Sequence, residues 1–547
     1  MRHAGSEFMA GGASGHGEAA PGDHLQTLYH LWLVGHQLDG GHAPWRDPYS
    51  FRPESKPTLN FAGWPFGVVF WPLDAAFGPV RGWNAFALLI YLAAGGLTCL
   101  WLRELGLPRG AALVGGLAFA IAPYRVAQST GHLLGPISIL LPLALYALER
   151  RWVVLAVAAV ASIPLSGQVH LALGAVPFFC AYALVRRRDL RTWVAVEAAV
   201  AAAVAAGFLV KTTTIDRSHL ASGRSLHAVS QYSAGFGDLV SRHKGHQPEQ
   251  FVFLGWATPL LAAAGLVLLW RGRRGLAAVL GLGAVVPILL ALGTNTPLYS
   301  GLWHALPPFR YPRVPERLMP IACLCLAALV AFAVARSRRA VLVPALAVAL
   351  LLVDLHVHVY GASAAGEDDR AYAALRDAPP GRVLELPVFM PDLHYGSVYM
   401  YYDMQARRER PAGYSTVAPR AAYDLLRTLL ALNCGRLDAE QLATLRRLGV
   451  RYVAVHRALY RHRRVEGQSC TQPPAQQLRS FPRLAHDSRI TIYELRSRSA
   501  SASAKPASSA PATCATSCAS WTGWGCASYG RTSASTCAGS VAARPWR

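Results

Sequence analysis

The chain has 547 residues, of which 53% are hydrophobic and only 15% are charged, and its formal net charge is +23 at pH 7. Repeated apolar runs separated by short arginine-rich or Pro/Gly-rich joints argue against a soluble globular fold and predict an all-α polytopic membrane protein. Because the basic residues lie mainly in these joints, membrane topology explains the positive charge better than nucleic-acid binding does.

Residues 1–21 show no regular pattern and no signal-peptide core. The topology predicted from the basic joints between apolar runs puts them on the outer face. An N-terminus on that face needs a preceding apolar helix to carry it across the membrane. We therefore expect that a first transmembrane helix is missing, through a misplaced start or a broken reading frame. The intact form would then have 11 spans rather than 10.

Residues 22–81 are predicted to form an outer loop that begins with the stretch GDHLQTLYHLWLVGHQL. Its leucines and Trp32 can lie along one face of a helix, which predicts an interfacial helix holding Asp23 at the depth of the lipid headgroups. Asp23 could instead simply cap this helix, because Asp is a favoured N-cap residue. The apolar run over 60–80 is broken by prolines, glycines and Asp74, so we expect it to be interfacial or re-entrant.

A multispan membrane domain is predicted over residues 82–360. Its candidate spans are approximately residues 82–102, 111–124, 133–149, 152–165, 169–185, 192–210, 251–270, 276–293, 317–335 and 340–359. Basic joints (RELGLPRG, ERRW, RRRDLR, RGRRG and ARSRRA) fall at every second connection, as they would if all were cytoplasmic. This alternation predicts that the loops 211–250 and 294–316, and everything after residue 360, lie on the outer face.

Residues 361–496 are predicted to form an extracytoplasmic α/β domain. GRVLELPVF, VRYVAVH and ITIYELR are typical of strands, and PRAAYDLLRTLLAL and DAEQLATLRRLG of helices, the second capped by Asp438. In an oxidising compartment Cys434 and Cys470 could form a disulfide or remain unpaired. Residues 497–547 are of low complexity, and we expect them to form a disordered tail.

Several segments occur in a characteristic order: GDHLQTLYHLWLVGHQLDGGHAPWRDPYSF, APYRVAQSTGHLLGPISILLPLALYALER, PPFRYPRVPERLMPI, and then LELPV, GYS and LGVRYVAVH. Over residues 22–496 this order resembles bacterial integral-membrane glycosyltransferases of the GT-C superfamily, which includes protein O-mannosyltransferases and aminoarabinose transferases. The resemblance implies a plasma-membrane enzyme that transfers a hexose or pentose from a polyprenyl-phosphate donor at the outer face. It also implies a catalytic or metal-associated Asp just after the first transmembrane helix, and Asp23 matches that position although the helix itself is absent.

Transfer from a lipid phosphate needs a carboxylate to take the proton of the acceptor hydroxyl, and cationic groups or a metal to stabilise the departing phosphate. We expect Asp23 to be this base, supported by His24. Asp47 and Glu54 in the same loop are further candidates for orienting the acceptor or binding a divalent cation, and each is otherwise a solvated loop charge. The sequence leaves the involvement of a metal open and indicates no other cofactor. A single displacement would invert the configuration of the sugar.

Basic residues predicted to face outward run against the positive-inside rule and are therefore candidates for binding the donor phosphate. They are Arg125 and His132 in PYRVAQSTGH, and Arg310, Arg313 and Arg317 in FRYPRVPER. The planar fork of arginine suits phosphate recognition, while the alternative is loop salt bridges or interfacial snorkelling. Arg242 and Lys244 in SRHKGHQPEQF mark a second candidate loop, which could act as a lid or contact the acceptor.

Two other functions are compatible with the sequence. A transporter or flippase of lipid-linked glycans would place charges near the membrane midplane, often on broken helices. Here Glu197 and Asp354 are the clearest acidic residues within predicted spans, and both lie close to an end. The unusual ends of the chain also fit an inactive membrane scaffold or a gene fragment. No short motif identifies the sugar or the cell-envelope glycan, lipid or protein that would accept it.

Overall fold

The computed structural model describes residues 5–12, 18–53, 58–243, 248–337, 339, 341–366, 369–461 and 472–495. The α-helices are α1 (Asp23–Asp39), α2 (Phe66–Glu104), α3 (Arg109–Ala120), α4 (Pro123–Ser129), α5 (Leu134–Ile137), α6 (Leu140–Glu149), α7 (Val153–Leu165), α8 (Val169–Arg186), α9 (Leu190–Thr213), α10 (Leu226–Ser230), α11 (Ala257–Trp270), α12 (Arg274–Ala291), α13 (Pro297–Ala305), α14 (Met319–Ala335), α15 (Leu342–Asp354), α16 (Arg370–Asp377), α17 (Ser397–Ala406), α18 (Arg420–Leu429), α19 (Ala439–Arg447) and α20 (Ala475–Leu478). The strands are β1 (Glu7–Ala10), β2 (Arg46–Asp47), β3 (Thr58–Leu59), β4 (Gly361–Ala364), β5 (Arg382–Leu386), β6 (Val450–His456), β7 (Arg483–His486) and β8 (Ile490–Glu494).

The apolar helices coincide with the segments predicted to span the membrane, since each predicted segment contains a helix. Five helices are long and apolar enough to cross a membrane: Phe66–Glu104, Val169–Arg186, Leu190–Arg217, Arg274–Ala291 and Pro315–Ala335. A sixth would be the pair α3 and α4, which is bent by 51° at a short break. The remaining predicted spans correspond to shorter apolar helices, so the number of spans stays a prediction.

Large apolar side chains project from the bundle surface. Val154 on α7, Leu92 on α2 and Leu260 on α11 are 83%, 73% and 73% exposed. Soluble proteins rarely expose extensive apolar surface, whereas hydrocarbon chains of a bilayer solvate it well. The helical region therefore has the surface of a multi-pass membrane protein.

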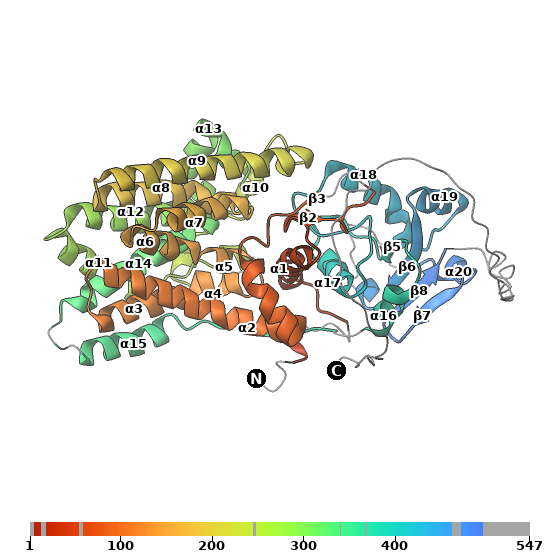
Figure 1. Ribbon diagram of the computed structural model, residues 1–547, viewed down its shortest axis with the longest axis horizontal. Helices are drawn as coiled ribbons and strands as arrows, with labels where there is room; N and C mark the ends of the chain where they lie inside the picture. The colour runs from red at the N-terminus through yellow and green to blue at the C-terminus, as the bar shows by residue number, and fades with distance from the viewer. Residues whose placement is uncertain are drawn as a thin grey trace, which may run out of the picture. The chain divides into compact units, whose positions relative to one another are not determined.

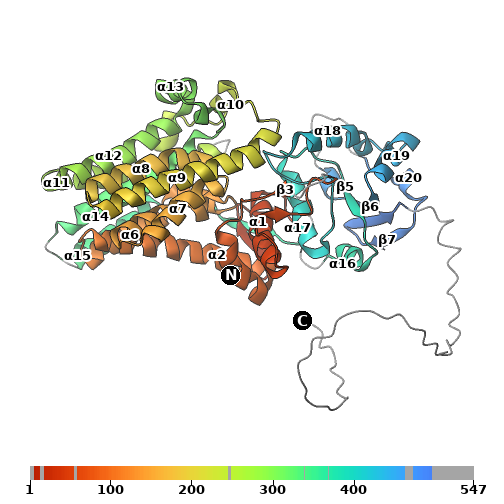
Figure 2. The same ribbon diagram turned by 45° about the horizontal axis from the view of Figure 1, so that its top comes forward.

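Helix α14 lies at the centre of the bundle. Its residues are almost all buried, and α3, α11 and α12 pack against it. Helices α7, α8 and α9 run alongside one another and join this core through the packing of α8 on α12 (Figure 2). The core is therefore built from the apolar faces of helices that are far apart in the sequence.

The proline-broken run that precedes the first predicted span is helical, but it does not form one straight helix with that span. Gly78 interrupts α2 with φ 76° and ψ 173°, and Pro72 and Pro79 flank the break. This left-handed backbone conformation strains any residue with a Cβ atom, so glycine suits the kink. The sequence breaks that predicted an interfacial or re-entrant segment thus correspond to a separate helical piece before the long helix.

Four of the basic joints meet at one end of the bundle. Glu149 is buried and forms ion pairs with Arg186 (2.7 Å) and Arg187 (3.5 Å). Next to it, Arg150 lies 3.3 Å from Glu104, and Arg273 donates a hydrogen bond to the carbonyl of Leu105 at 2.8 Å. These contacts place the joints that follow α2, α6, α8 and α11 on the same side, as their alternation predicts.

The C-terminal region contains a four-stranded sheet in the order β5-β6-β8-β7, with β5 and β6 parallel and the other pairs antiparallel (Figure 1). The strands and helices predicted between residues 382 and 494 are present. The predicted cap of α19 is confirmed, because the Asp438 side chain accepts a hydrogen bond from the amide of Gln441 at 2.8 Å. The described residues up to Leu495 group into one compact unit, and the predicted domain boundary near residue 361 stays a prediction.

The N-terminal segment contains a strand that the sequence pattern did not predict. Strand β1 pairs antiparallel with β4, with Phe8 opposite Ser363. Further along, the buried Glu18 lies 3.2 Å from His456 of β6. Strand β1 and Glu18, both before α1 in the sequence, therefore contact the C-terminal region.

Candidate active site

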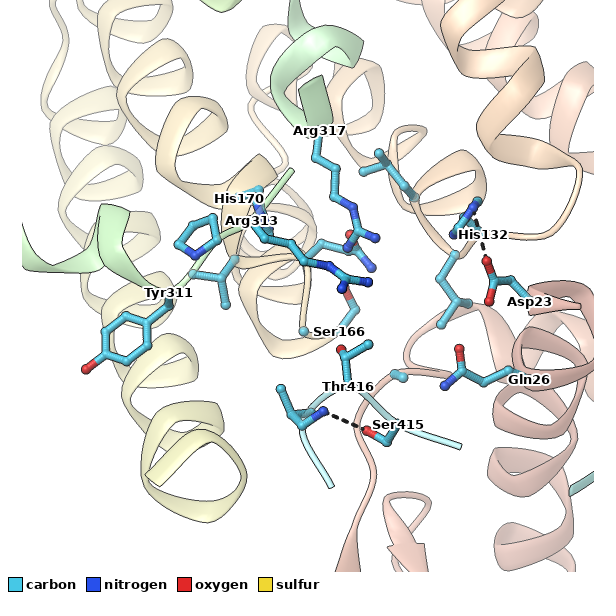
Figure 3. Close-up of a pocket in the computed structure, with 18 of the residues that line it drawn as sticks. Asp23, Gln26, His132, Ser166, His170, Tyr311, Arg313, Arg317, Ser415 and Thr416 are labelled. Atoms are coloured by element: carbon cyan, nitrogen blue, oxygen red, sulfur yellow. Dashed lines mark hydrogen bonds and ion pairs between the residues drawn. The ribbon is translucent and has the colours of Figure 1, made fainter. Parts of the chain in front are cut away.

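A cavity of about 250 Å³ lies where the loops at the other end of the bundle meet the C-terminal region. Its lining comes from the first turn of α1 and from the connections before α5, before α8, after α9, before α14 and before α18. Figure 3 shows Asp23 and His132 on one side of this space and the ends of Arg313 and Arg317 on the other. All of these connections belong to the set predicted to face outward.

Asp23 is the first residue of α1, but it does not cap the helix. Gly22 occupies the N-cap position, and no side-chain cap is present. Instead, the Asp23 carboxylate accepts a hydrogen bond from the hydroxyl of Tyr414 (2.6 Å to Oδ1) and lies 3.3 Å from His132 Nε2 through Oδ2. The side chain keeps 28% of its surface exposed to the cavity. The simple capping role is therefore not what the geometry shows.

The surroundings of Asp23 favour its ionised form. Burial is the largest single influence and acts to raise the pKa, but the positive charge of His132 and the hydrogen bond from Tyr414, helped by His394 and Arg317, outweigh it. The net pKa is below the ordinary value for an aspartate. The carboxylate is therefore available as a proton acceptor near neutral pH.

Close backbone contacts hold the acidic side of the cavity together. Thr27 donates a hydrogen bond to the carbonyl of Gly131 at 2.6 Å, and Gln26 donates one to the carbonyl of Tyr414 at 2.7 Å. A Cβ atom on Gly131 would lie 3.0 Å from the amide nitrogen of His24, so the absence of a side chain permits this close approach. The sequence STGH thereby brings His132 to the start of α1.

The basic side of the cavity contains Arg224, Arg313 and Arg317. Among the described residues, none of these guanidinium groups has a carboxylate partner, and Arg313 packs over the ring of Tyr232 at 4.7 Å. Burial and the neighbouring charge of Arg313 lower the pKa of Arg224 to about 10. Three guanidinium groups that share a cavity and form no ion pair with any described carboxylate make a site suited to a phosphate group.

Sequence reasoning missed most of the other residues that line this cavity, among them His170, Arg224, Glu249 and Tyr414. His170 Nε2 accepts a hydrogen bond from the amide of Val314 at 3.3 Å and so braces the loop that carries Arg313. These four lie in or beside connections that the topology predicts to face outward. That predicted location is the sequence feature that could have indicated them. That signal does not distinguish them from the other polar residues of the same loops.

Three of the predicted phosphate ligands line the cavity (His132, Arg313 and Arg317), whereas Arg125 and Arg310 do not. Arg125 is fully buried and donates hydrogen bonds to Ser138 Oγ and to the carbonyls of Ala120 and Ile90. Arg310 donates to the carbonyls of Trp303 and His304. Their guanidinium groups support the backbone rather than the cavity.

The other predicted site residues lie outside this cavity. His24 is buried against Phe8, and burial lowers its pKa to about 4. Asp47 accepts hydrogen bonds from Tyr29 and from two backbone amides of its own turn, and it lines a neighbouring cavity of about 150 Å³. Arg242 donates to the carbonyls of Val353 and Asp354.

Some predictions fall outside the described residues, namely those for Glu54, Lys244 and Cys470. Cys434 is disulfide-bonded, but its pairing with Cys470 stays a prediction. Within the part of the chain that the structure describes, no group of three or more His, Cys, Asp or Glu side chains is arranged to hold a metal ion.

Comparisons with known proteins support the fold at the level of solved structures. No protein-family model matches the chain, and no curated protein sequence is similar to it. The chain is similar to the arabinofuranosyltransferase AftD from Mycobacteria, with a TM-score of 0.52 and 15% identity, over 89% of this chain and 40% of AftD. It therefore spans well under half of the length of AftD.

Two weaker likenesses have TM-scores below 0.5. One is to the oligosaccharyltransferase AglB from Archaeoglobus fulgidus in complex with an inhibitory peptide and a dolichol-phosphate, with a TM-score of 0.41 and 11% identity, over 84% of this chain and 68% of AglB. The other is to ArnT from Cupriavidus metallidurans bound to undecaprenyl phosphate, with a TM-score of 0.45 and 14% identity, over 88% of this chain and 95% of ArnT. The likeness to AftD shows that this chain shares the fold of that arabinofuranosyltransferase over most of its own length.

Proposed function

We propose that the protein is a plasma-membrane glycosyltransferase that transfers a sugar from a polyprenyl-phosphate donor to a hydroxyl group of an extracytoplasmic acceptor, with inversion. One observation carries this proposal. An aspartate held in its ionised form shares a single cavity with three guanidinium groups that form no ion pair among the described residues, in a chain whose fold is similar to that of AftD. A base and an anion site that line one cavity are what transfer from a phosphate ester requires.

In the proposed reaction Asp23 accepts the proton of the acceptor hydroxyl. The acceptor oxygen then attacks the anomeric carbon of the sugar, and the bond from that carbon to the phosphate oxygen breaks. The departing lipid phosphate changes from one negative charge to two, and Arg313 and Arg317 stabilise the added charge. Because the displacement occurs once, without a sugar attached to the protein, the anomeric configuration inverts.

The location of the cavity supports a lipid-linked donor acting at the outer face. The cavity is formed by connections opposite the basic joints of the bundle, and its lining includes Val169 and His170 at the start of the apolar helix α8. A phosphate on a polyprenyl chain would lie at this depth, with its chain in the bilayer and its sugar in the cavity. From the same predicted topology we infer that the C-terminal α/β region lies on the extracytoplasmic side.

A transporter is less well supported than an enzyme by the acidic residues within the helices. Both carboxylate oxygens of Asp354 accept hydrogen bonds at the N-terminus of α11, from the amides of residues 256–258 and from Thr258 Oγ1. The Asp354 carboxylate therefore stabilises the N-terminus of α11 and is not free to bind a transported group. Glu197 is exposed on α9 instead of facing a central pathway.

The test is consumption of a panel of polyprenyl-phosphate sugars by membranes containing the protein. We expect Asp23→Asn to lower turnover by about 10²- to 10⁴-fold, the range typical of losing a general base. Asp39→Asn is the matched control, because Asp39 lies at the other end of the same helix and contacts Trp71. Equal turnover in the wild type and Asp23→Asn would contradict the proposal.

A further inference from the structure

Tyr414 reaches the start of α1 from the connection between α17 and α18, at the opposite end of the sequence. Its hydroxyl is 2.6 Å from Asp23 Oδ1, and its carbonyl accepts a hydrogen bond from Gln26 at 2.7 Å. Its amide lies 3.3 Å from Met400 Sδ. With only 8% of its surface exposed, the phenol is held in one place by its backbone and by Asp23.

The segment that leads to Asp23 is bound to the same C-terminal region. The amide of Gly22 donates a hydrogen bond to Ser397 Oγ at 3.1 Å, and the amide of Ala19 donates one to the hydroxyl of Tyr402 at 3.2 Å. Ser397 and Tyr402 belong to α17, which packs against α1. Asp23 and Tyr414 are therefore brought together by one continuous set of contacts rather than by a chance approach of two loops.

A phenol in this position donates a hydrogen bond to the Asp23 carboxylate over the working pH range. Burial and the negative charge of Asp23 raise the pKa of Tyr414 well above its ordinary value, so the hydroxyl keeps its proton. A hydrogen bond donated to a carboxylate stabilises the charged form and fixes its rotation, while each carboxylate oxygen retains a further lone pair. The acceptor hydroxyl can therefore approach Asp23 while Tyr414 remains bound.

We propose that Tyr414 is a positioning residue for the transfer reaction, supplied by the α/β region, which orients the Asp23 carboxylate and keeps it ionised. This inference rests on the proposed function, in which Asp23 is the base. It assigns to the C-terminal region a direct part in the reaction centre. Removing only the hydroxyl, in Tyr414→Phe, should preserve the packing of the ring and isolate this effect.

The first test needs no donor. Dicyclohexylcarbodiimide modifies protonated carboxyl groups, so its reaction with Asp23 in the full-length membrane protein, followed across pH by peptide mass spectrometry, reports when this carboxylate takes up a proton. In Tyr414→Phe we expect the midpoint to move to higher pH. Labelling of Asp39 in the same samples should keep its own midpoint, which shows that the protein is folded and equally accessible.

Tyr311→Phe is the matched control variant. Tyr311 also lines the cavity, but Figure 3 shows its ring pointing away from Asp23. In this variant we expect the pH midpoint of Asp23 labelling to equal that of the wild type. An unchanged midpoint in Tyr414→Phe, or an equal shift in Tyr311→Phe, would overturn the assignment of Tyr414.

The second test uses turnover of a polyprenyl-phosphate sugar. Because only ionised Asp23 can accept a proton, the acidic limb of the rate profile should move to higher pH in Tyr414→Phe by the same amount as the labelling midpoint. A labelling shift without a matching shift of the limb would overturn the positioning role. Turnover of no donor by the wild type, combined with a labelling shift, would instead count against the proposed function while leaving the contact between Tyr414 and Asp23 supported.

Discussion

Asp23 has two polar neighbours with separable effects on its charge. Tyr414 donates a hydrogen bond, whereas His132 contributes a positive charge when it is protonated. Both lower the pKa of Asp23 against the effect of burial. A variant that keeps a hydrogen-bonding side chain at position 132 but removes the charge therefore isolates the electrostatic part.

We predict that His132→Gln moves the acidic limb of the rate profile to higher pH. The folded-state pKa of Asp23 is depressed, so losing a positive neighbour lets it rise and leaves less ionised base at acidic pH. At higher pH the rate should approach that of the wild type. The measurement is turnover across pH, with His42→Gln, an exposed residue beyond the end of α1, as the control. An acidic limb that stays in place in His132→Gln would refute the electrostatic role.

Arg313 and Arg317 should stabilise the lipid phosphate as it departs from the sugar. We predict that Arg317→Gln lowers kcat/KM for the polyprenyl-phosphate sugar by about 10²-fold. A hydrogen-bond donor aimed at the charge that develops in the transition state typically contributes that much. Arg310→Gln should have a much smaller effect, because the Arg310 guanidinium is bound to backbone carbonyls outside the cavity. Steady-state kinetics on the same donor compare them. A larger loss in Arg310→Gln than in Arg317→Gln would contradict the assigned phosphate site.

At the scale of elements, the ends of the helices carry the polar contacts that fix the bundle. Glu149, at the end of α6, is almost completely buried, with its side chain 2% exposed, and it holds α8 through Arg186. Glu104, at the end of α2, makes a similar pair with Arg150 but is 32% exposed. Water screens the second pair and not the first, so the two pairs should differ in their effect on stability.

We predict that Glu149→Ala lowers the free energy of unfolding by about 3 kcal/mol, because it leaves the positive charge of Arg186 without its buried carboxylate partner. Glu104→Ala should change it by less than about 1 kcal/mol, as is usual for an exposed ion pair. Unfolding of the purified protein in the same detergent measures both variants. Equal losses would show that burial does not control the contribution of these pairs.

Elements with a strong local pattern could be predicted from the sequence, and those that depend on distant partners could not. VRYVAVH is strand β6 at the predicted residues, because β-branched and aromatic residues favour a buried strand wherever it pairs. Strand β1 was missed because its four residues have no strong pattern and are ordered by β4, far along the chain. Tyr414 and Arg224 were missed for the same reason: loop conformation, not local sequence, brings them to Asp23.

At the scale of the whole molecule, the cavity and the basic joints lie at opposite ends of the helical bundle, so the membrane topology determines on which side the reaction would occur. Both the cavity and the network of basic joints are formed by connections between helices, but by alternate ones. If the joints are cytoplasmic, as the positive-inside rule predicts, the cavity opens on the opposite face. The orientation can be measured without any substrate.

We predict that a cysteine introduced at Gly301 reacts with a membrane-impermeant maleimide in intact cells, whereas one at Gly272 reacts only after the membrane is permeabilised. Both glycines are exposed, and a Cβ atom at either position would meet no other atom within 4 Å, so neither substitution should disturb the fold. Peptide mass spectrometry separates the new cysteines from the native ones. The reverse pattern would place the cavity on the cytoplasmic side.

The central claim is that Asp23 performs the chemistry while the arginines bind the donor phosphate. The most direct measurement is a single-turnover experiment on membranes loaded with a polyprenyl-phosphate sugar, in which bound donor and transferred sugar are quantified separately for Asp23→Asn. We predict that donor remains bound at the wild-type level while transfer slows by about 10²- to 10⁴-fold. Transfer at the wild-type rate from the bound donor would show that another group is the base and would contradict the assignment of this cavity as the reaction centre.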